Sequence, residues 1–208
     1  GYVSTLSTAG PDDTNISLYF NVGSSVVING GAENGGATVI DADIEANNGI
    51  IHVVDNVITL PTVVNFAIAD PNLSILVTAL TREDQPDFVG TLSGTTNSPF
   101  TVFTPTNQAF ADLLTELSAE SLNDIDAATL EATLNYHVVA LANVRSTGLS
   151  DDLTVSTLGG DITANVTGGP TLTDANDRIS NIITTALDIQ ATNGVIHQID
   201  KVILPPLS

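Results

Sequence analysis

A sixteen-residue segment occurs twice in this chain, once near its start and once near its end. Asp43–Ile58 and Asp188–Ile203 are identical at ten of sixteen positions, with a constant offset of 145 residues. This interval exceeds the length of a solenoid repeat and matches that of a whole small domain. We therefore predict that residues 62–208 form one complete unit, and that residues 1–61 form the C-terminal portion of a similar unit ahead of it.

Each copy is predicted to be a tight turn that leads into a β-strand. An Asn-Gly pair stands before a β-branched run in both copies, and Asn-Gly supplies the positive φ that such a turn needs. A histidine follows among apolar neighbours, so we expect its ring nitrogens to bond to the backbone at a packed surface. This structural interpretation is favoured over a ligand or catalytic role for both histidines. The residues concerned are Asn48, Gly49, His52 and Asp55 in the first copy and Asn193, Gly194, His197 and Asp200 in the second.

The chain is strongly acidic, with 24 acidic residues, four basic ones and a formal net charge of −20. Phosphate groups would be repelled, so nucleic acid is excluded as a natural partner and direct docking on anionic lipid is disfavoured. Hydrophobic residues make up 42% of the chain, which is typical of a globular protein, so we expect the charge on a solvated surface. No apolar run approaches the roughly 18 residues needed to cross a bilayer, and no direct membrane insertion is expected in this segment.

The pattern of apolar residues changes along the chain from strands to helices and back to strands. Residues 1–40 combine short β-favouring runs with glycine-rich turns and predict a β meander. Thr62 can cap a helix over Val63–Ala69, and helical spacing recurs as far as Tyr136. From His137 onward the runs favour strands again, so the order indicates an α+β fold. The expected helices are 63–69, 73–80, 107–117 and 126–136, and the expected strands of this part are 100–104, 138–141, 153–158, 161–166, 171–173, 179–183, 186–190 and 195–204.

Three segments of the chain match the conserved motifs of a known domain family. They are Pro99–Leu113 (PFTVFTPTNQAFADL), Leu134–Val139 (LNYHVV) and Asn193–Pro205 (NGVIHQIDKVILP). In this order they resemble the first conserved box, the Tyr-His motif and the second conserved box of the fasciclin domain (FAS1) family. They occur in the family's order, whereas residues 1–61 match only the second half of such a domain, through Asn47–Pro61. The resemblance implies a fasciclin-like β-sandwich wedge with helices packed on it, plus an N-terminal partial β-rich unit. It also implies cell adhesion or matrix attachment by a secreted or cell-surface protein.

The first box has a physical interpretation of its own. Pro105 biases Thr104 toward an extended conformation, and Thr106 or Asn107 can cap the helix that follows. The side chain of Phe110 is then directed into the core. These residues are therefore expected to be structural.

The Tyr-His motif, Tyr136 and His137, admits two interpretations. Burial of an aromatic body with a hydrogen-bonded polar tip is ordinary architecture. The resemblance also links the pair to adhesion, so both residues are kept as a candidate binding site. The structural role is favoured over direct receptor contact.

No catalytic motif is recognisable in the sequence. It has no G-x-S-x-G elbow, H-E-x-x-H pair, Walker A loop or dinucleotide fingerprint. The lack of cysteine also removes thiolate zinc sites and thiol nucleophiles. We therefore expect that the protein is not an enzyme and that it has no cofactor and no metal site. Acidic clusters such as Asp12-Asp13, Asp151-Asp152 and Asp174–Asp177 could bind calcium, but none has EF-hand spacing, and solvated turns are the favoured interpretation.

Three functions are compatible with the sequence. The favoured one is a non-catalytic extracellular module that binds a protein or glycan partner. The second is a structural subunit that self-associates, because a neighbouring chain completes its partial N-terminal unit and covers exposed strand edges. The third is a carrier that holds an apolar small ligand between helices and sheet.

Overall fold

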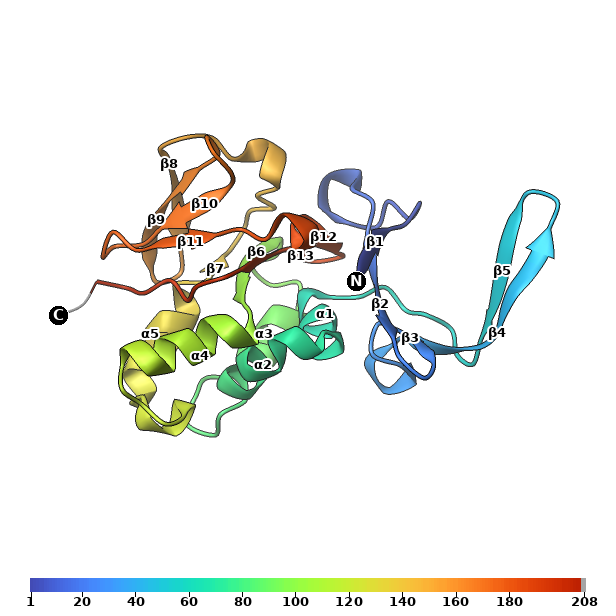
Figure 1. The fold of residues 1–208 in the computed structure, drawn as a ribbon. Helices are drawn as coiled ribbons and strands as arrows, with labels where there is room; N and C mark the ends of the chain where they lie inside the picture. The colour runs from blue at the N-terminus through green and yellow to red at the C-terminus, as the bar shows by residue number, and fades with distance from the viewer. Residues whose placement is uncertain (207–208) are drawn as a thin grey trace.

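Two four-stranded sheets and five α-helices build the body of the molecule, and the first 54 residues form a third sheet beside it (Figure 1). This computed structural model describes residues 1–206. Helices and sheets are segregated along the chain, which confirms the predicted α+β class.

The helices form one layer of the body, and polar side chains set their starts. In the helix α1, Thr62 accepts a hydrogen bond from the Asn65 backbone N–H, while the Asn65 side chain accepts from the Thr62 N–H, a capping box. The predicted cap at Thr62 is thus confirmed. A helix after Pro86 was not predicted; Asp87 caps it by accepting from the Gly90 N–H. The helices are α1 (Val63–Ala69), α2 (Ser74–Leu80), α3 (Phe88–Ser93), α4 (Asn107–Glu116) and α5 (Ala127–Asn135).

The central sheet of the body has the order β12-β13-β6-β7. Its strands are β12 (Ile189–Ala191), β13 (Gly194–Ile199), β6 (Phe100–Pro105) and β7 (Val138–Val139). Strand β13 runs parallel to β6, with Ile196 opposite Val102. Every residue of β13 and β6 is buried, because helices cover one face and a second sheet covers the other. The final strand ends at Ile199, so the predicted end at residue 204 is wrong.

The second sheet is an antiparallel meander with the order β11-β10-β9-β8. Its strands are β8 (Leu153–Thr157), β9 (Gly160–Asn165), β10 (Thr171–Thr173) and β11 (Ile179–Asn181). Apolar side chains from this sheet share a core with Phe103 and Ile199 of the central sheet. The helices form a further core around Phe110 and Leu130.

The N-terminal sheet, like the second sheet, consists of antiparallel strands that follow one another along the chain. Its last two strands form a long hairpin. Its order is β1-β2-β3-β4-β5, antiparallel throughout, which confirms the predicted β meander over residues 1–40. The strands are β1 (Tyr2–Ser4), β2 (Ser17–Val22), β3 (Val26–Ile28), β4 (Ala37–Ala46) and β5 (Gly49–Val54). Strand β4 is long enough to pair with β3 at its start and with β5 at its end.

A buried carboxylate joins the N-terminal sheet to the body. Asp70, 2% exposed, accepts hydrogen bonds from the hydroxyls of Tyr2 (3.0 Å) and Tyr19 (3.3 Å) and from the Gln198 amide (2.7 Å). The two tyrosine rings lie 4.8 Å apart, and Tyr2 also meets Phe66 edge to face. Burial, followed by the Asp70 charge, raises the pKa of Tyr19 to about 12 and also raises the pKa of Tyr2. The sequence analysis assigns no role to Asp70, so its part in this junction was missed.

Removal of one hydroxyl tests this junction. We expect Tyr2→Phe to lower the free energy of unfolding by about 2 kcal/mol, because a hydrogen bond to a buried charged group is lost. Tyr19→Phe is the matched control and should cost less, since its bond to Asp70 is longer. Urea unfolding of the three proteins measures the difference. Equal stability of Tyr2→Phe and the parent would contradict this role of the Asp70 junction.

Within residues 1–206, no single helix has the length and apolar character to span a bilayer. Helix α1 and the segment Pro71–Leu80 meet the length and composition test only as a pair, bent by 98°.

Candidate interaction surface

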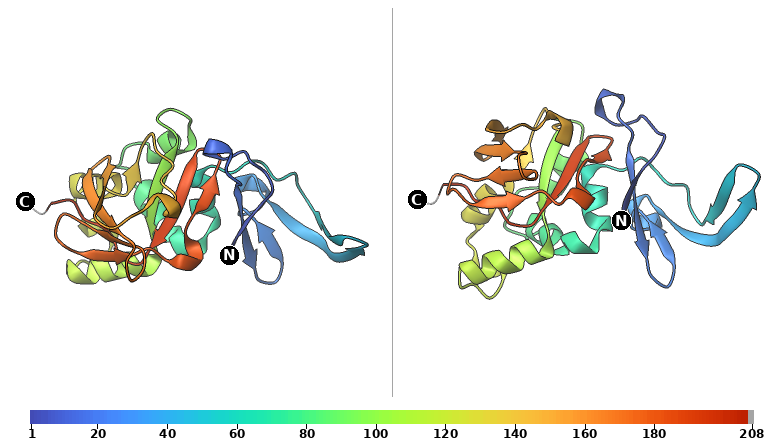
Figure 2. Two further views of the ribbon diagram at one scale, coloured as in Figure 1. Left: turned by 90° about the horizontal axis from the view of Figure 1, so that it is seen from above. Right: turned by 45° about the horizontal axis from the view of Figure 1, so that its top comes forward.

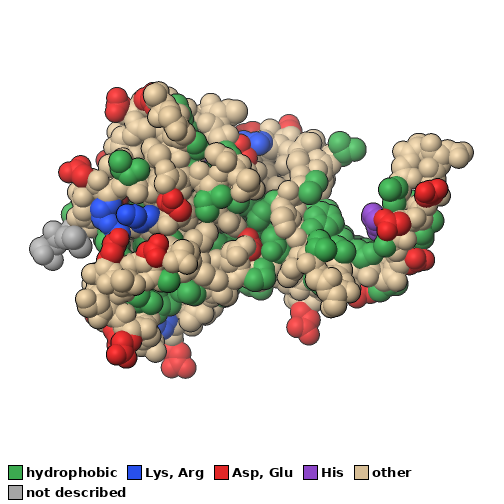
Figure 3. Space-filling view, viewed as in Figure 1, with side chains coloured by type: hydrophobic (Ala, Val, Ile, Leu, Met, Phe, Trp, Pro, Cys, Tyr) green, Lys and Arg blue, Asp and Glu red, His purple; other side chains and the backbone are tan. Residues whose placement is uncertain are grey.

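The hairpin formed by β4 and β5 projects away from the rest of the molecule, and we call it the arm (Figures 1 and 2). Apolar side chains are exposed on it: Ile50 retains 61% of its accessible area and Ile51 53%. Acidic side chains lie among them (Figure 3). A large exposed aliphatic surface on a paired strand is unusual for a free monomer and marks an interaction site.

The arm has the same local geometry as β12 and β13, its repeat equivalents in the body. The Asp43 backbone N–H donates to His52 Nδ1 at 3.2 Å, and the Asp188 N–H donates to His197 Nδ1 at 3.2 Å. Both aspartates are left-handed, with φ of 59° and 55°.

A second pair of bonds repeats in the same way. The Thr38 N–H donates to Asp55 Oδ1 at 2.7 Å, and the Asn181 N–H donates to Asp200 Oδ1 at 2.7 Å. Both aspartates thus accept a backbone hydrogen bond, and the structural role of Asp55 and Asp200 stays a prediction. The first copy therefore keeps the local fold of the second although nothing in residues 1–206 covers it.

The surroundings of the two histidines differ completely. His197 is fully buried and stacks on Phe103, and its Nε2 donates to the Val144 carbonyl at 2.9 Å. Burial lowers the pKa of His197, with the Val144 bond opposing the shift, so the ring is neutral. The predicted packed, backbone-bonded state is confirmed for His197. It is wrong for His52, which is exposed and, within residues 1–206, forms a hydrogen bond through Nδ1 alone, because no described strand lies on the outer edge of β5.

The asparagines and glycines of the two copies differ in the same way. Asn193 accepts from the Val63 N–H at 3.0 Å and donates to the Leu92 carbonyl at 2.7 Å. A Cβ on Gly194 would lie 2.1 Å from the Phe100 carbonyl oxygen, so this glycine allows β6 to approach. Asn48 is exposed and makes no side-chain hydrogen bond within residues 1–206, and a Cβ on Gly49 would meet nothing within 4 Å.

The turn chemistry predicted from Asn-Gly is wrong for the first copy and holds only at the glycine of the second. The turn residues are 47–48 and 192–193, and Gly194 has a φ of 159°, whereas Gly49, Asn48 and Asn193 do not have positive φ. The left-handed positions are instead Asp43 and Asp188, five residues earlier. A short polar side chain tolerates this conformation, and the resulting irregularity in β4 points the histidine Nδ1 at the backbone.

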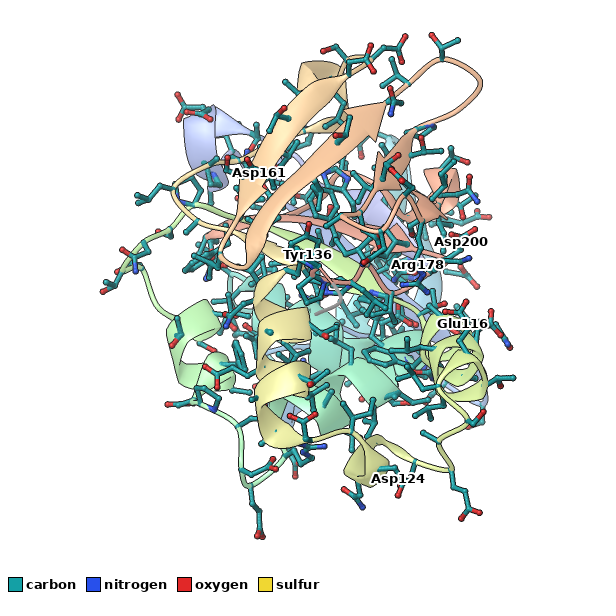
Figure 4. The ribbon with its side chains drawn as sticks, turned by 90° about the vertical axis from the view of Figure 1, so that its left-hand side faces the viewer. Glu116, Asp124, Tyr136, Asp161, Arg178 and Asp200 are labelled. Atoms are coloured by element: carbon teal, nitrogen blue, oxygen red, sulfur yellow. The ribbon has the colours of Figure 1, made fainter. Side chains whose placement is uncertain are left out.

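Tyr136 lies beneath the second sheet (Figure 4) and is 1% exposed. Its neighbour His137 is also buried, at 3% exposure. The Tyr136 hydroxyl donates to the Asp161 carbonyl at 2.6 Å. His137 Nδ1 donates to the Thr133 carbonyl at 2.7 Å, and its Nε2 accepts from the Ile203 N–H at 3.2 Å. Burial lowers the pKa of His137 to about 4, so the ring is neutral. These contacts give the pair an architectural role, and its adhesive role stays a prediction.

The first box joins two helices. Thr106, not Asn107, caps α4 by accepting from the Ala109 N–H. Asn107 is the first helical residue, and its side chain accepts from the Ile75 N–H at 2.9 Å and donates to the Pro71 carbonyl at 2.9 Å, which binds α4 to α2. Phe110 is 1% exposed in the helical core, as predicted.

A small cavity lies between the helices and the central sheet. Its volume is about 100 Å³, and α1, α2 and α3 line it together with Thr104 and Ile196. The Thr104 hydroxyl is buried and has no hydrogen-bond partner within residues 1–206. The other residues that line this cavity are mainly apolar, and the carrier function stays a prediction.

All four basic side chains lie near acidic ones. On the face drawn in Figure 3, further acidic side chains are scattered without a basic neighbour. Arg178 bonds Glu116 at 2.5 Å and the Val202 carbonyl at 3.0 Å (Figure 4). Of the acidic clusters, Asp151 accepts from the Val166 N–H and Asp174 from the Asn176 N–H, so both stabilise turns. Within residues 1–206, no group of three histidine or acidic side chains is placed to hold a metal ion.

Known proteins resemble this chain in sequence and in structure. The model of the fasciclin domain matches residues 2–61 and 71–205. Uncharacterized protein sll1735 of Synechocystis is 34% identical over 147 residues, which make up 70% of this chain and 98% of that protein. Human periostin is 29% identical over 171 residues, 81% of this chain but 19% of periostin. The chain belongs to the fasciclin domain family, and the resemblance seen in its motifs is confirmed.

A solved structure supports the fold. A FAS1 domain pair from the insect cell adhesion molecule Fasciclin I has a TM-score of 0.63 at 23% identity, covering 92% of this chain and 68% of its own. The fasciclin-like architecture is thereby confirmed. The division into units 1–61 and 62–208 stays a prediction, and its last two residues lie outside the described part of the chain.

Proposed function

We propose that this chain is a non-catalytic extracellular attachment module. Membership of the fasciclin domain family carries the proposal, together with the likeness of the fold to a domain pair from an insect cell adhesion molecule. The bonding of His137 and His197 supports it, because both rings are buried and hydrogen-bonded and so are not placed to act as an acid or base on a substrate. A secreted or cell-surface location is part of the same proposal.

The charge of the surface defines the partner's chemistry. With 24 acidic side chains and every basic one beside an acid, this surface attracts a protein with a basic patch and repels a sulfated glycan. We therefore place a basic extracellular protein ahead of a glycan as the partner.

Binding to a panel of purified matrix proteins, ordered from acidic to basic, tests the attachment function. We expect saturable binding to basic members, weakened at least roughly tenfold between about 50 and 500 mM salt, because salt screens exposed charges. A variant carrying Glu83→Gln, Glu120→Gln and Glu131→Gln should bind more weakly, while Asn123→Gln, which keeps the charge, should not. Lack of saturable binding across the panel would count against the proposal.

A second function, assembly with another polypeptide through the arm, is supported by a different observation. Strand β5 keeps the backbone geometry of β13 but leaves its apolar side chains exposed. Light scattering coupled to size exclusion tests it over a wide concentration range. Growth of the mass with concentration supports assembly between copies of this chain, and a monomer throughout argues against assembly between copies.

A further inference from the structure

We propose that the outer edge of β5 binds the first half of another fasciclin unit, with a strand like β6 added in parallel. This inference rests on the assembly function proposed above and identifies its partner. The internal repeat carries it, because β13 shows what the same sequence binds when its partner is present.

The backbone of β5 is prepared for a parallel strand in one register. Among residues 1–206, β5 pairs with β4 alone, on its inner edge, whereas β13 lies between β12 and β6. On β13, Gly194 faces Phe100 and Ile196 faces Val102. The constant offset of the repeat transfers this register to β5, so Ile51 is placed opposite the partner's equivalent of Val102.

Gly49 points to the same partner. In the body, Gly194 is required because β6 comes so close that a Cβ would overlap the Phe100 carbonyl. Gly49 has no such neighbour within residues 1–206 and does not adopt a left-handed φ. A residue without a Cβ is needed at position 49 only when a strand approaches β5 as closely as β6 approaches β13.

Two polar side chains of the arm also lack their expected partners. Asn193 bonds the α1 N-terminus and the end of α3, and His197 Nε2 bonds the Val144 carbonyl beyond β7. All of these groups belong to the first half of the body. Asn48 and His52 Nε2 stand at the equivalent places with no hydrogen bond within residues 1–206.

The exposed apolar residues require helices as well as a strand. Ile189, Ala191 and Ile196 are the equivalents of Ile44, Ala46 and Ile51, and they pack in a core with α1, α3 and β6. A single added strand would satisfy the edge of β5 but leave this face in water. The partner is therefore a first half with both helices and strand. A second intact copy of this chain does not supply one, because its own β6 lies between β13 and β7.

A designed duplication tests the inference with the whole chain present. A second copy of residues 62–152 is joined ahead of Gly1. This added segment precedes β1 in the same way that the original residues 62–152 precede β8. We expect the β5 amides to exchange at least about 100-fold more slowly than in the unmodified chain, because an exposed edge becomes the centre of a sheet. Unchanged exchange of β5, or loss of cooperative folding, would overturn the inference.

Cysteine cross-linking then tests the register, since the chain has no cysteine of its own. Ile51→Cys is combined with Val102→Cys in the added segment only, and we expect a disulfide on mild oxidation. Ile50→Cys with the same partner is the control, because this side chain points to the opposite face of the strand. Equal cross-linking of both pairs would overturn the register.

The behaviour of the unmodified chain separates this inference from the assembly function. A register-specific disulfide in the duplicated chain supports the proposed partner even if the unmodified chain stays monomeric. A monomeric unmodified chain would refute only assembly between copies of this chain. Concentration-dependent association of the unmodified chain without a disulfide in the duplicated one would overturn the partner and leave assembly standing.

Discussion

Gly194→Ala is expected to lower the free energy of unfolding by about 3 kcal/mol or more, whereas Gly49→Ala leaves it within about 0.5 kcal/mol of the parent. The added Cβ at Gly194 would lie 2.1 Å from the Phe100 oxygen and 2.8 Å from its nitrogen. Both are backbone atoms of the central sheet, so neither can move without breaking the pairing of β13 with β6. At Gly49 the new methyl group enters solvent.

Urea unfolding of both variants, followed by far-ultraviolet circular dichroism, measures the two effects. The pair is matched, because the same substitution is made after the same Asn in the two copies of one repeat. Similar losses at both positions would show that β5 is already covered in solution. A silent Gly194→Ala would mean that β13 and β6 are not in close contact.

The stability of the protein is expected to fall by about 3 kcal/mol as the pH drops from about 6.5 to 4. Burial holds the pKa of His137 at about 4, below the 6.5 of an unfolded chain. Between these values the unfolded state binds a proton that the folded state excludes, so acid favours unfolding. His197, whose pKa burial also lowers, adds to the loss in the same direction.

Unfolding curves recorded at several pH values, together with NMR titration of the imidazole protons, check this prediction. The His137 signal should not titrate above about pH 5. A His137 signal that titrates near pH 6.5 in the folded protein would refute the buried neutral state.

Much of the body could be predicted from sequence because local signals and packing agree there. The cap at Thr62 and the burial of His197 and Phe110 follow from patterns that the tertiary structure keeps. Helix α3 was missed because only six residues form it and its start is marked by Asp87 alone. Length and periodicity give almost no signal in so short an element.

The candidate site was harder to predict because exposure depends on a neighbour and not on the residue itself. His52 and His197 lie in nearly the same sequence, and the repeat suggested the same packed state for both. Only the three-dimensional arrangement shows that one edge is paired and the other is open. Asp70 was missed for a related reason, since its tyrosine partners lie 68 and 51 residues away in the chain.

The two Asn-Gly pairs should also deamidate at different rates. An asparagine side chain loses ammonia when the nitrogen of the following glycine attacks its carbonyl carbon, and the resulting succinimide opens with water to aspartate or isoaspartate. The reaction needs a backbone free to bend. Asn193 is 4% exposed and its amide is bonded at both ends, so it is protected, whereas Asn48 stands exposed at the tip of the arm. Deamidation will therefore be faster at Asn48 on the arm than at Asn193, and a partner bound to the arm would slow it.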